Sequence, residues 1–285
     1  MASAPLEHLF VDVAGLRLHV VQAGPLHGRP VILLHGFPDF WIGWRYQIDA
    51  LASAGFRVIA PDQRGYNLSD KPSGIRQYTI EKLVADIAAL ADTLGVERFH
   101  LVGHDWGGVV AWAAATQLAA RLDKLVIVNA PHPAIMASYA VRSPSQLLRS
   151  SYVAFFQLPW VPEVVLTAGE CAMLVRVLSE SSRPGAFTPE EVSEYREAWQ
   201  KPGALTAMLN WYRALPYNPR MAEQITTPTL LLWGLKDRFL ESGLAESSLS
   251  MCVNARLQTF ADATHWLQRE EPEAVNAALL SFLET

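Results

Sequence analysis

The hexapeptide Gly103-His-Asp-Trp-Gly-Gly108 constrains the fold of this chain more strongly than any other segment. It directly follows a short apolar run at residues 99–102, which has the length and composition of a buried strand. The glycines allow a tight turn from this strand into a helix, and such a turn holds the side chain of Asp105 out at its tip. A strand, a turn and a helix in succession are the repeating unit of an α/β protein. Taken alone, Asp105 also fits a simple helix cap.

The residue at the tip of this turn decides which reactions are possible. A serine that attacked a saturated carbon would form an ether, which water does not readily cleave, whereas a carboxylate forms an ester, which water can hydrolyse. Asp105 therefore predicts a substrate that is opened at a saturated carbon, such as an epoxide or an alkyl halide, rather than an ester or an amide.

Length and composition indicate one large α/β domain with an insertion, because 285 residues with 51% hydrophobic side chains can bury a sizeable core. The net charge of −5 provides no basic surface, so we do not expect nucleic acid as a partner. Cys171 and Cys252 form no CxxC pair and indicate no disulfide framework.

Sequence signals for secretion, for a membrane span and for binding a metal or a nucleotide cofactor are missing from this chain. The first residues lack a basic stretch followed by an apolar one, so we expect no signal peptide. No run approaches the roughly 18 apolar residues of a membrane span. The histidines show no metal-ligand spacing, and there is no nucleotide-binding glycine loop. We therefore expect a cytoplasmic protein without metal or cofactor, and leave its oligomeric state open.

The hydrophobic pattern predicts a mostly parallel central sheet that is covered by helices on both faces. An alternating segment around residues 11–21 indicates an opening antiparallel hairpin. Short apolar runs follow, separated by helical patterns, and a final helix is expected at residues 272–283. The expected strands lie at residues 31–34, 56–60, 99–102, 125–128, 229–233 and 256–260.

The strand spacing breaks between residue 130 and about residue 219. This stretch is too long for one crossover helix, and it is rich in proline and aromatic residues with helical periodicity. We therefore predict a helical cap at residues 131–218, inserted into a core formed by residues 1–130 and 219–285. An independent second domain is the alternative.

The turn His35-Gly-Phe-Pro38 follows the strand expected at residues 31–34. A turn at that place can aim the backbone N–H of Phe37 at the site, and together with the N–H of Trp106 it predicts an oxyanion hole. The His35 ring is expected to hold this loop through hydrogen bonds.

Asp237 and His265 follow the last two expected strands. An imidazole can take a proton from water while a buried carboxylate fixes its orientation and stabilises its charged form. We therefore predict His265 as the general base and Asp237 as the residue that orients it. Asp262 is the competing acid, but it lies on the same loop as His265 and is poorly placed to reach the far ring nitrogen.

With these residues in place, the chain resembles the α/β-hydrolase-fold epoxide hydrolases over essentially its whole length. The resemblance rests on His35-Gly-Phe-Pro-Asp39, Asp62-Gln-Arg-Gly-Tyr-Asn-Leu-Ser-Asp-Lys-Pro72, the Gly103–Gly108 turn and the order Asp105, Asp237, His265. It implies the α/β-hydrolase fold with Asp105 as nucleophile. Haloalkane dehalogenases share these motifs. Thr264 stands where the family often has glycine.

The resemblance also implies two tyrosines in the cap. Epoxide hydrolases resemble one another in a Tyr-x-x-x-Phe-Gln segment and an Asn-Trp-Tyr-Arg segment, which correspond here to Tyr152 and Tyr212. A phenol is a far stronger acid than the alcohol that forms from an epoxide, so two phenols can polarise the ring oxygen and supply its proton. Packing alone is the alternative role for both residues.

The predicted reaction is the hydrolysis of a small apolar epoxide to a vicinal diol through an ester on Asp105. Phe37 counts against a dehalogenase, because the second halide donor is often Asn or Trp at that place. A haloalkane dehalogenase and a non-catalytic receptor of the same fold remain the rival functions. Large apolar side chains are expected to line the pocket, although each could belong to the core: Phe37, Trp41, Trp106, Phe155, Phe156 and Trp266.

Overall fold

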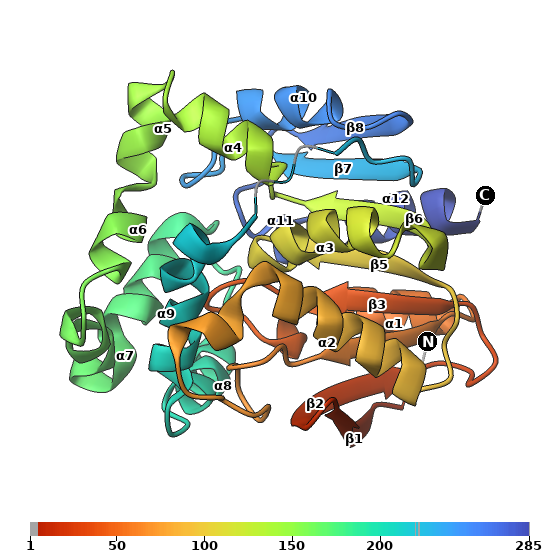
Figure 1. Cartoon of the computed structure of the whole chain (residues 1–285), viewed down its shortest axis with the longest axis horizontal. Helices are drawn as coiled ribbons and strands as arrows, with labels where there is room; N and C mark the ends of the chain where they lie inside the picture. Colours follow the sequence, from red (N-terminus) through yellow and green to blue (C-terminus); the bar gives the residue numbers. More distant parts are fainter. Residues whose placement is uncertain (1–4, 220, 222, 285) are drawn as a thin grey trace.

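A computed structural model describes residues 5–219, 221 and 223–284 of the chain. Within these residues an eight-stranded sheet forms the centre of the molecule, in the order β1-β2-β4-β3-β5-β6-β7-β8 (Figure 1). Its first strands form an antiparallel hairpin, β2 and β4 are also antiparallel, and all later neighbours are parallel. The strands are β1 (Glu7–Val13), β2 (Leu16–Ala23), β3 (Pro30–Leu34), β4 (Arg57–Pro61), β5 (Phe99–His104), β6 (Leu122–Val128), β7 (Thr229–Gly234) and β8 (Ala255–Phe260). The predicted fold class is confirmed.

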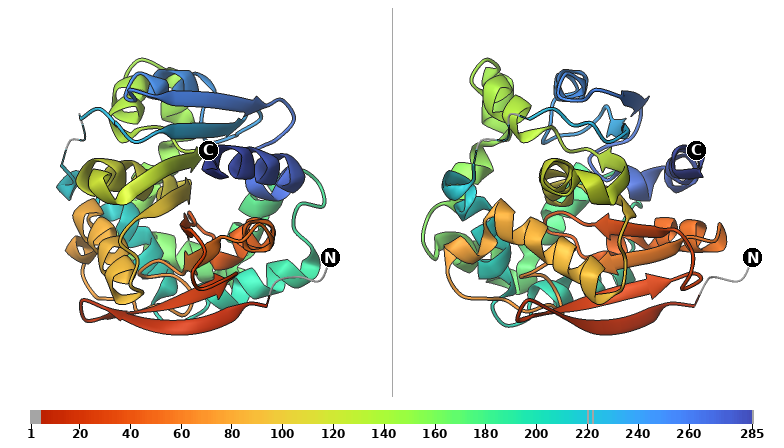
Figure 2. Two further views of the ribbon diagram at one scale, coloured as in Figure 1. Left: turned by 90° about the vertical axis from the view of Figure 1, so that its right-hand side faces the viewer. Right: turned by 45° about the vertical axis from the view of Figure 1, so that its right-hand side comes forward.

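Helices cover both faces of the sheet, as a parallel sheet requires. Figure 2 shows α2 (Ile80–Thr93) and α3 (Trp106–Gln117) on one side and α1 (Arg45–Ser53) and α12 (Pro272–Glu284) on the other. α10 (Gly243–Leu249) packs on the last strand. Shorter helical turns complete the core: η1 (Trp41–Trp44), η2 (Ile75–Tyr78), η3 (Ala119–Arg121) and α11 (Leu267–Glu270).

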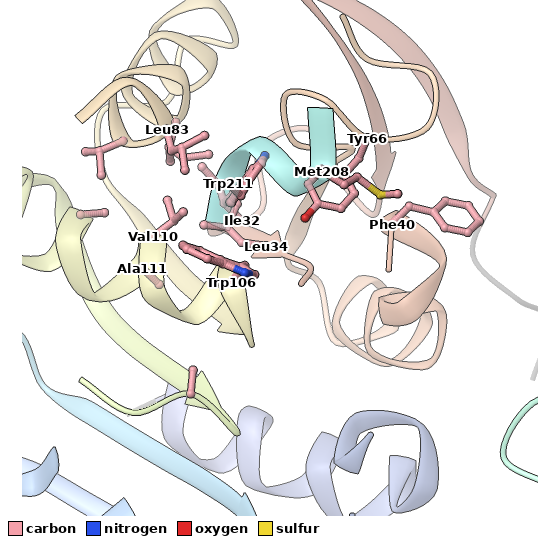
Figure 3. Close-up of a cluster of buried hydrophobic side chains, with 14 of the residues drawn as sticks. Ile32, Leu34, Phe40, Tyr66, Leu83, Trp106, Val110, Ala111, Met208 and Trp211 are labelled. Carbon is pink, nitrogen blue, oxygen red and sulfur yellow. The ribbon is translucent and has the colours of Figure 1, made fainter. Parts of the chain in front are cut away.

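Side-chain alternation along each strand creates two cores. In β3, Val31 and Leu33 join the cluster under α1 and α12, whereas Ile32 and Leu34 join the cluster under α2 and α3. Figure 3 shows the second cluster, where Leu83 of α2 and Val110 of α3 gather over the sheet. Because both faces are buried at the centre of the sheet, the central strands β3 and β7 are apolar almost throughout.

The chain between β6 and β7 forms helices and no strand among the described residues. These helices lie beyond the carboxyl ends of the central strands (Figure 1). The helices are α4 (Pro133–Ala140), α5 (Pro144–Arg149), α6 (Ser151–Phe156), α7 (Val161–Ser181), α8 (Pro189–Trp199), α9 (Ala204–Arg213) and the short η4 (Leu215–Tyr217). In α7, residues 168–171 leave the helical conformation. We call α4 to η4 the helical segment, and retain its division from the core at residues 131–218 as a proposal.

The innermost helix of this segment is α9. Its Met208 and Trp211 are fully buried and meet Phe40 and Tyr66 of the core loops (Figure 3). The Trp211 indole donates a hydrogen bond of 3.1 Å to the carbonyl oxygen of Arg64. Burial on this scale stabilises each large side chain by about 2 kcal/mol, so α9 is held firmly against the strand ends. In the described part of the chain, no helix combines the length and the apolarity needed to cross a membrane.

Candidate active site

Asp105 lies at the turn between β5 and α3, as the glycine pattern predicts. Its backbone has φ 50° and ψ −121°, a conformation that is costly for any residue other than glycine. The surrounding packing imposes it, because a Cβ added at Gly107 would lie 2.1 Å from the carbonyl oxygen of Leu34. The first turn of α3 therefore needs glycine at position 107, because it lies directly against the end of β3.

The backbone N–H of Phe37 donates a hydrogen bond of 2.8 Å to Oδ1 of Asp105. Gly36 makes this approach possible, since a Cβ there would lie 2.4 Å from the same oxygen. Trp106 is the first residue of α3, and N–H groups in the first turn of a helix have no acceptor within the helix. The structure thus places both predicted oxyanion-hole residues beside the carboxylate.

His265 lies between Asp237 and Asp105, the two acidic residues predicted for the site. Its Nδ1 is 2.7 Å from Oδ2 of Asp237, and its Nε2 is 3.6 Å from Oδ2 of Asp105. His265 and Asp237 are almost completely buried. The competing Asp262 is exposed and pairs with Lys236 at 2.7 Å, so it takes no part in this arrangement.

Asp237 is held by a set of hydrogen bonds that sequence reasoning missed in part. Its Oδ1 accepts from the backbone N–H groups of Phe239 (2.8 Å) and Leu240 (3.0 Å), and its Oδ2 accepts from the side-chain amide of Asn129 (2.7 Å). Asn129 also accepts from the N–H of Gly234 at 3.0 Å. Its place directly after β6, at the same edge of the sheet as Asp105, is the signal that could have identified it.

The charges of Asp105, Asp237 and His265 act on one another and determine which of these residues carry a proton. Burial alone would lower the pKa of His265, but the carboxylates of Asp237 and Asp105 raise it to about 10. Burial would likewise raise the pKa of Asp105, but the positive charge of His265, with a smaller contribution from the hydrogen bond of the Phe37 amide, lowers it below its usual value. At neutral pH the site therefore holds an ionised Asp105 beside a protonated His265.

Two other histidines fix the loops around these residues. Burial lowers the pKa of His104 to about 3, so its neutral ring donates through Nε2 to the carbonyl oxygen of His265 at 2.8 Å. The Nε2 of His35 accepts from the N–H of Gln63 at 3.0 Å, which leaves Nδ1 to donate to the carbonyl oxygen of Gly36 at 3.0 Å. His35 thus holds the loop that presents Phe37.

Two cavities meet at Asp105. One of about 250 Å³ extends along α3 and α4, and the other of about 160 Å³ extends toward α7 and His265. Asp105, Tyr152 and Tyr212 border both. Nearly all other lining side chains are apolar: Val109, Met136, Val153 and Leu240 in the first, and Phe37, Phe156, Leu174 and Phe239 in the second. An apolar molecule can therefore extend to either side of the carboxylate.

Tyr152 of α6 and Tyr212 of α9 face one another across this junction, with ring centroids 5.9 Å apart. The Tyr212 ring also packs edge-on against the Trp106 ring, with centroids 5.0 Å apart. Burial raises the pKa of both phenols above the usual value, and the charge of Asp105 raises it further. Both phenols thus keep their protons at neutral pH.

The predicted pocket residues divide between the two cavities. Trp106 lines the first, and Phe37, Phe155, Phe156 and Trp266 line the second. Trp41 differs from its prediction, because it lines neither cavity.

The Trp41 ring instead packs edge-on against His8 of β1 and against Phe40. The backbone N–H of Trp41 donates a hydrogen bond of 3.1 Å to Oδ1 of Asp62, which fixes this part of the loop with the ring on the β1 side. Among the described residues, no group of three His, Cys, Asp or Glu side chains is arranged to hold a metal ion.

Comparisons with known proteins agree with this geometry. The family model described as alpha/beta hydrolase fold matches residues 29–272. The chain is 48% identical to the AB hydrolase superfamily protein YfhM of Bacillus subtilis (strain 168), over 96% of this chain and 97% of that protein. It is 40% identical to epoxide hydrolase 4 of Homo sapiens, over 97% of this chain and 79% of that protein.

A crystal structure of the Bacillus megaterium epoxide hydrolase in complex with an inhibitor superposes with a TM-score of 0.89 at 30% identity, covering 97% of this chain and all of that one. Fold, sequence and the arrangement at the strand ends thus lead to the same group of enzymes. The chain belongs to the epoxide hydrolases of the α/β-hydrolase fold family.

Proposed function

We propose that this enzyme converts a small apolar epoxide and water to a vicinal diol through a hydroxyalkyl ester on Asp105. One observation carries the proposal: the two oxygens of Asp105 have different surroundings. Oδ1 accepts the hydrogen bond from Phe37, while Oδ2 faces His265 at 3.6 Å, beyond hydrogen-bond length. One oxygen is thus held by the loop, and the other is free to react.

In the first half-reaction, Oδ2 of Asp105 attacks the less hindered epoxide carbon. The C–O bond of the ring breaks and its electron pair goes to the epoxide oxygen, which Tyr152 and Tyr212 hold. The carboxylate charge that raised the pKa of both phenols disappears as the ester forms. The phenols therefore become stronger acids at the moment when the new alkoxide needs a proton.

The proton on His265 balances this step. Once Asp105 is an ester, one of the two carboxylates that raise the pKa of His265 is neutral, so the imidazolium releases its proton more readily. That proton replaces the one that the phenol pair gives to the alkoxide. The ester intermediate then contains a neutral His265, a free alcohol and two protonated tyrosines.

In the second half-reaction, neutral His265 takes a proton from a water molecule that attacks the ester carbonyl carbon. Negative charge develops on Oδ1, where the N–H groups of Phe37 and Trp106 stabilise it, at about 3 kcal/mol per donor. The bond between the carbonyl carbon and the alkyl oxygen breaks, and the leaving alkoxide takes the proton from His265. The carboxylic acid of Asp105 then returns a proton to His265, which restores the starting state.

The phenol pair favours an epoxide over an alkyl halide. A halide needs no proton and binds to weak donors such as indole N–H groups. Here the Trp106 ring packs edge-on against Tyr212, and Phe37 offers no side-chain donor. The two apolar cavities on either side of Asp105 support substrates with one or two apolar arms. The helical segment, which supplies both phenols and much of both cavity walls, is proposed to act as the cap.

Turnover of a panel of terminal, aryl and fatty-acid epoxides, with the diol products resolved by chirality, tests this function. A single turnover in water labelled with oxygen-18 should place the label in Asp105 and not in the diol, because water attacks the ester carbonyl. Label in the diol would indicate direct attack of water on the epoxide, and turnover of alkyl halides alone would indicate a dehalogenase.

A further inference from the structure

Helix α8 is joined to the loop that carries Phe37. The Tyr195 hydroxyl donates a hydrogen bond of 2.6 Å to Oδ1 of Asp39, and the Trp199 indole donates one of 2.6 Å to the carbonyl oxygen of Pro38. Tyr195, Trp199 and Asp39 are at most 2% exposed. Hydrogen bonds in such a dry environment are strong and costly to leave unmade.

The two acceptors follow Phe37 directly in the chain. The N–H of Asp39 donates to the carbonyl oxygen of Gly36 at 3.1 Å, so residues 36–39 form one tight turn. The Phe37 N–H that contacts Asp105 lies within this turn. A change at Pro38 or Asp39 therefore moves the Phe37 donor, since nothing flexible lies between them.

The core fixes α8 from its other side as well. Glu191, in the first turn of α8, pairs with Arg269 at 2.8 Å and also with Arg45. Arg269 lies in α11, directly after the segment that carries His265. α8 is thus held between the Phe37 loop and the His265 segment, both of which serve ester hydrolysis in the proposed mechanism.

The phenols of the first half-reaction belong to other helices. Tyr152 lies on α6 and Tyr212 on α9, and their ring contacts are with Phe37, Trp106, Phe156, Phe239 and each other. Among the described residues, no hydrogen bond found in the structure connects Tyr195 or Trp199 to either phenol. The helical segment therefore supplies two separate sets of side chains: Tyr152 and Tyr212 at the junction of the two cavities, and Tyr195 and Trp199 at the Phe37 loop.

A donor to Oδ1 acts oppositely on the two half-reactions. When Asp105 attacks the epoxide, its carboxylate loses charge, so the Phe37 hydrogen bond stabilises the starting state more than the transition state. When water attacks the ester, Oδ1 gains charge, and the same hydrogen bond stabilises the transition state. Misplacing Phe37 must then slow the second step and leave the first unchanged or slightly faster.

We propose that Tyr195 and Trp199 are positioning residues for the second half-reaction, which hold the Phe37 N–H where charge develops during ester hydrolysis. This inference rests on the proposed function. Neither side chain contacts the reacting atoms. Their hydrogen bonds instead determine whether the oxyanion hole has its full strength.

The test is a single-turnover measurement on Tyr195→Phe, Trp199→Phe and the double variant with styrene oxide. Quenched flow followed by intact-protein mass gives the rates of ester formation and ester decay separately. We expect ester formation to stay within about twofold of the unmodified enzyme, while ester decay slows about tenfold in the double variant, less than the loss of a whole donor. An equal fall in both rates, or no change in ester decay, would overturn the inference.

Controls separate positioning from loss of stability. Tyr78→Phe removes a comparable hydrogen bond, of 2.8 Å to the carbonyl oxygen of Pro72, from a buried tyrosine outside the Phe37 loop. It should leave the ratio of the two rates unchanged. Asp39→Asn keeps an acceptor for Tyr195, so its ester should decay faster than the ester on Asp39→Leu. This comparison provides a second test if Trp199→Phe does not fold. An unmodified enzyme that forms no ester with any epoxide would instead contradict the proposed function itself.

Discussion

The two sides of the active-site chamber differ in their chemistry. The side formed by the strand ends is charged and rigid: Asp105, His265 and Asp237 form an ion-pair chain in which nearly every polar atom has a fixed partner. The side formed by the helical segment is neutral, with two phenols set among apolar side chains. Charged groups can make and cleave an ester, whereas phenols and apolar walls can select what is attached. In the proposed mechanism, the strand ends therefore determine the reaction type, and the helices determine the leaving atom and the substrate.

Removing the nucleophile should have the largest effect. Asp105→Asn keeps the shape of the chamber but not the nucleophilic charge, so diol formation is expected to fall by at least about 10⁴-fold. The matched control is Asp262→Asn, which removes an exposed carboxylate from the loop of His265 and should leave turnover within about twofold. Substantial diol formation by Asp105→Asn would remove the strand ends from the covalent chemistry.

Removing the phenols should affect only the first half-reaction. Tyr152→Phe and Tyr212→Phe are each expected to slow ester formation by about 10- to 100-fold, and the double variant by about 10³-fold or more, because one phenol can still hold the oxygen in each single variant. Ester decay, measured in single turnovers, should change little. If ester decay slowed as much as ester formation, the division of tasks between the two sides of the chamber would be wrong.

The charge on the strand-end side should appear in the pH dependence of stability. The folded pKa of His265 is about 10, above the value of 6.5 for an unperturbed histidine, so the folded state holds a proton that the unfolded state releases. The resulting stabilisation is fully present below pH 6.5 and is lost as the pH rises toward 10. Relative to His265→Gln, the free energy of unfolding should decrease by on the order of 4 kcal/mol over this range.

Urea unfolding at pH 6 and pH 9.5 on both proteins measures this difference, because titrations elsewhere in the chain cancel. Equal pH dependence in the two proteins would mean that His265 is neutral in the resting enzyme. The proton balance of the proposed mechanism would then have to change.

The smallest effect is expected at the residue that supports Asp237 from behind. Asn129→Ala removes the hydrogen bonds to Asp237 and Gly234, so we expect a loss of about 2 kcal/mol in stability and a decrease of about tenfold in ester decay. Asn129→Asp places a second carboxylate against Asp237 and should be worse than Ala. Ester formation should stay nearly constant in both variants, which single turnovers can verify.

The sequence predicts the strand-end side far better than the helical side. In a parallel sheet, residues that follow successive strands converge at one edge whatever the details of packing, so Asp105, Asp237 and His265 could be identified from strand positions alone. The six predicted parallel-strand segments agree with the structure to within three residues: β5 extends to His104, two residues beyond the apolar run, and β6 begins at Leu122, three residues before it.

Helical periodicity gives no such convergence. It identifies a buried face but not the residue on that face that reaches the nucleophile, so Tyr152 and Tyr212 required a family resemblance. The hydrogen bonds of Tyr195 and Trp199 to the Phe37 loop join segments more than 150 residues apart in the chain. Nothing local in the sequence indicates them. Trp41 was misplaced for a related reason, because its ring turns toward a β1 residue that the local pattern does not include.

In the proposed mechanism an epoxide becomes covalently attached to Asp105, and His265 is needed to release it. The most direct test is intact-protein mass of His265→Gln after incubation with an epoxide, with Asp105→Asn/His265→Gln as the control. We expect the protein mass to rise by the full mass of the epoxide in the single variant and to stay unchanged in the double variant. Diol formation without any adduct would contradict a covalent intermediate on Asp105. A mass rise equal to an alkyl halide minus hydrogen halide after incubation with that halide, with epoxides inert, would indicate a dehalogenase instead.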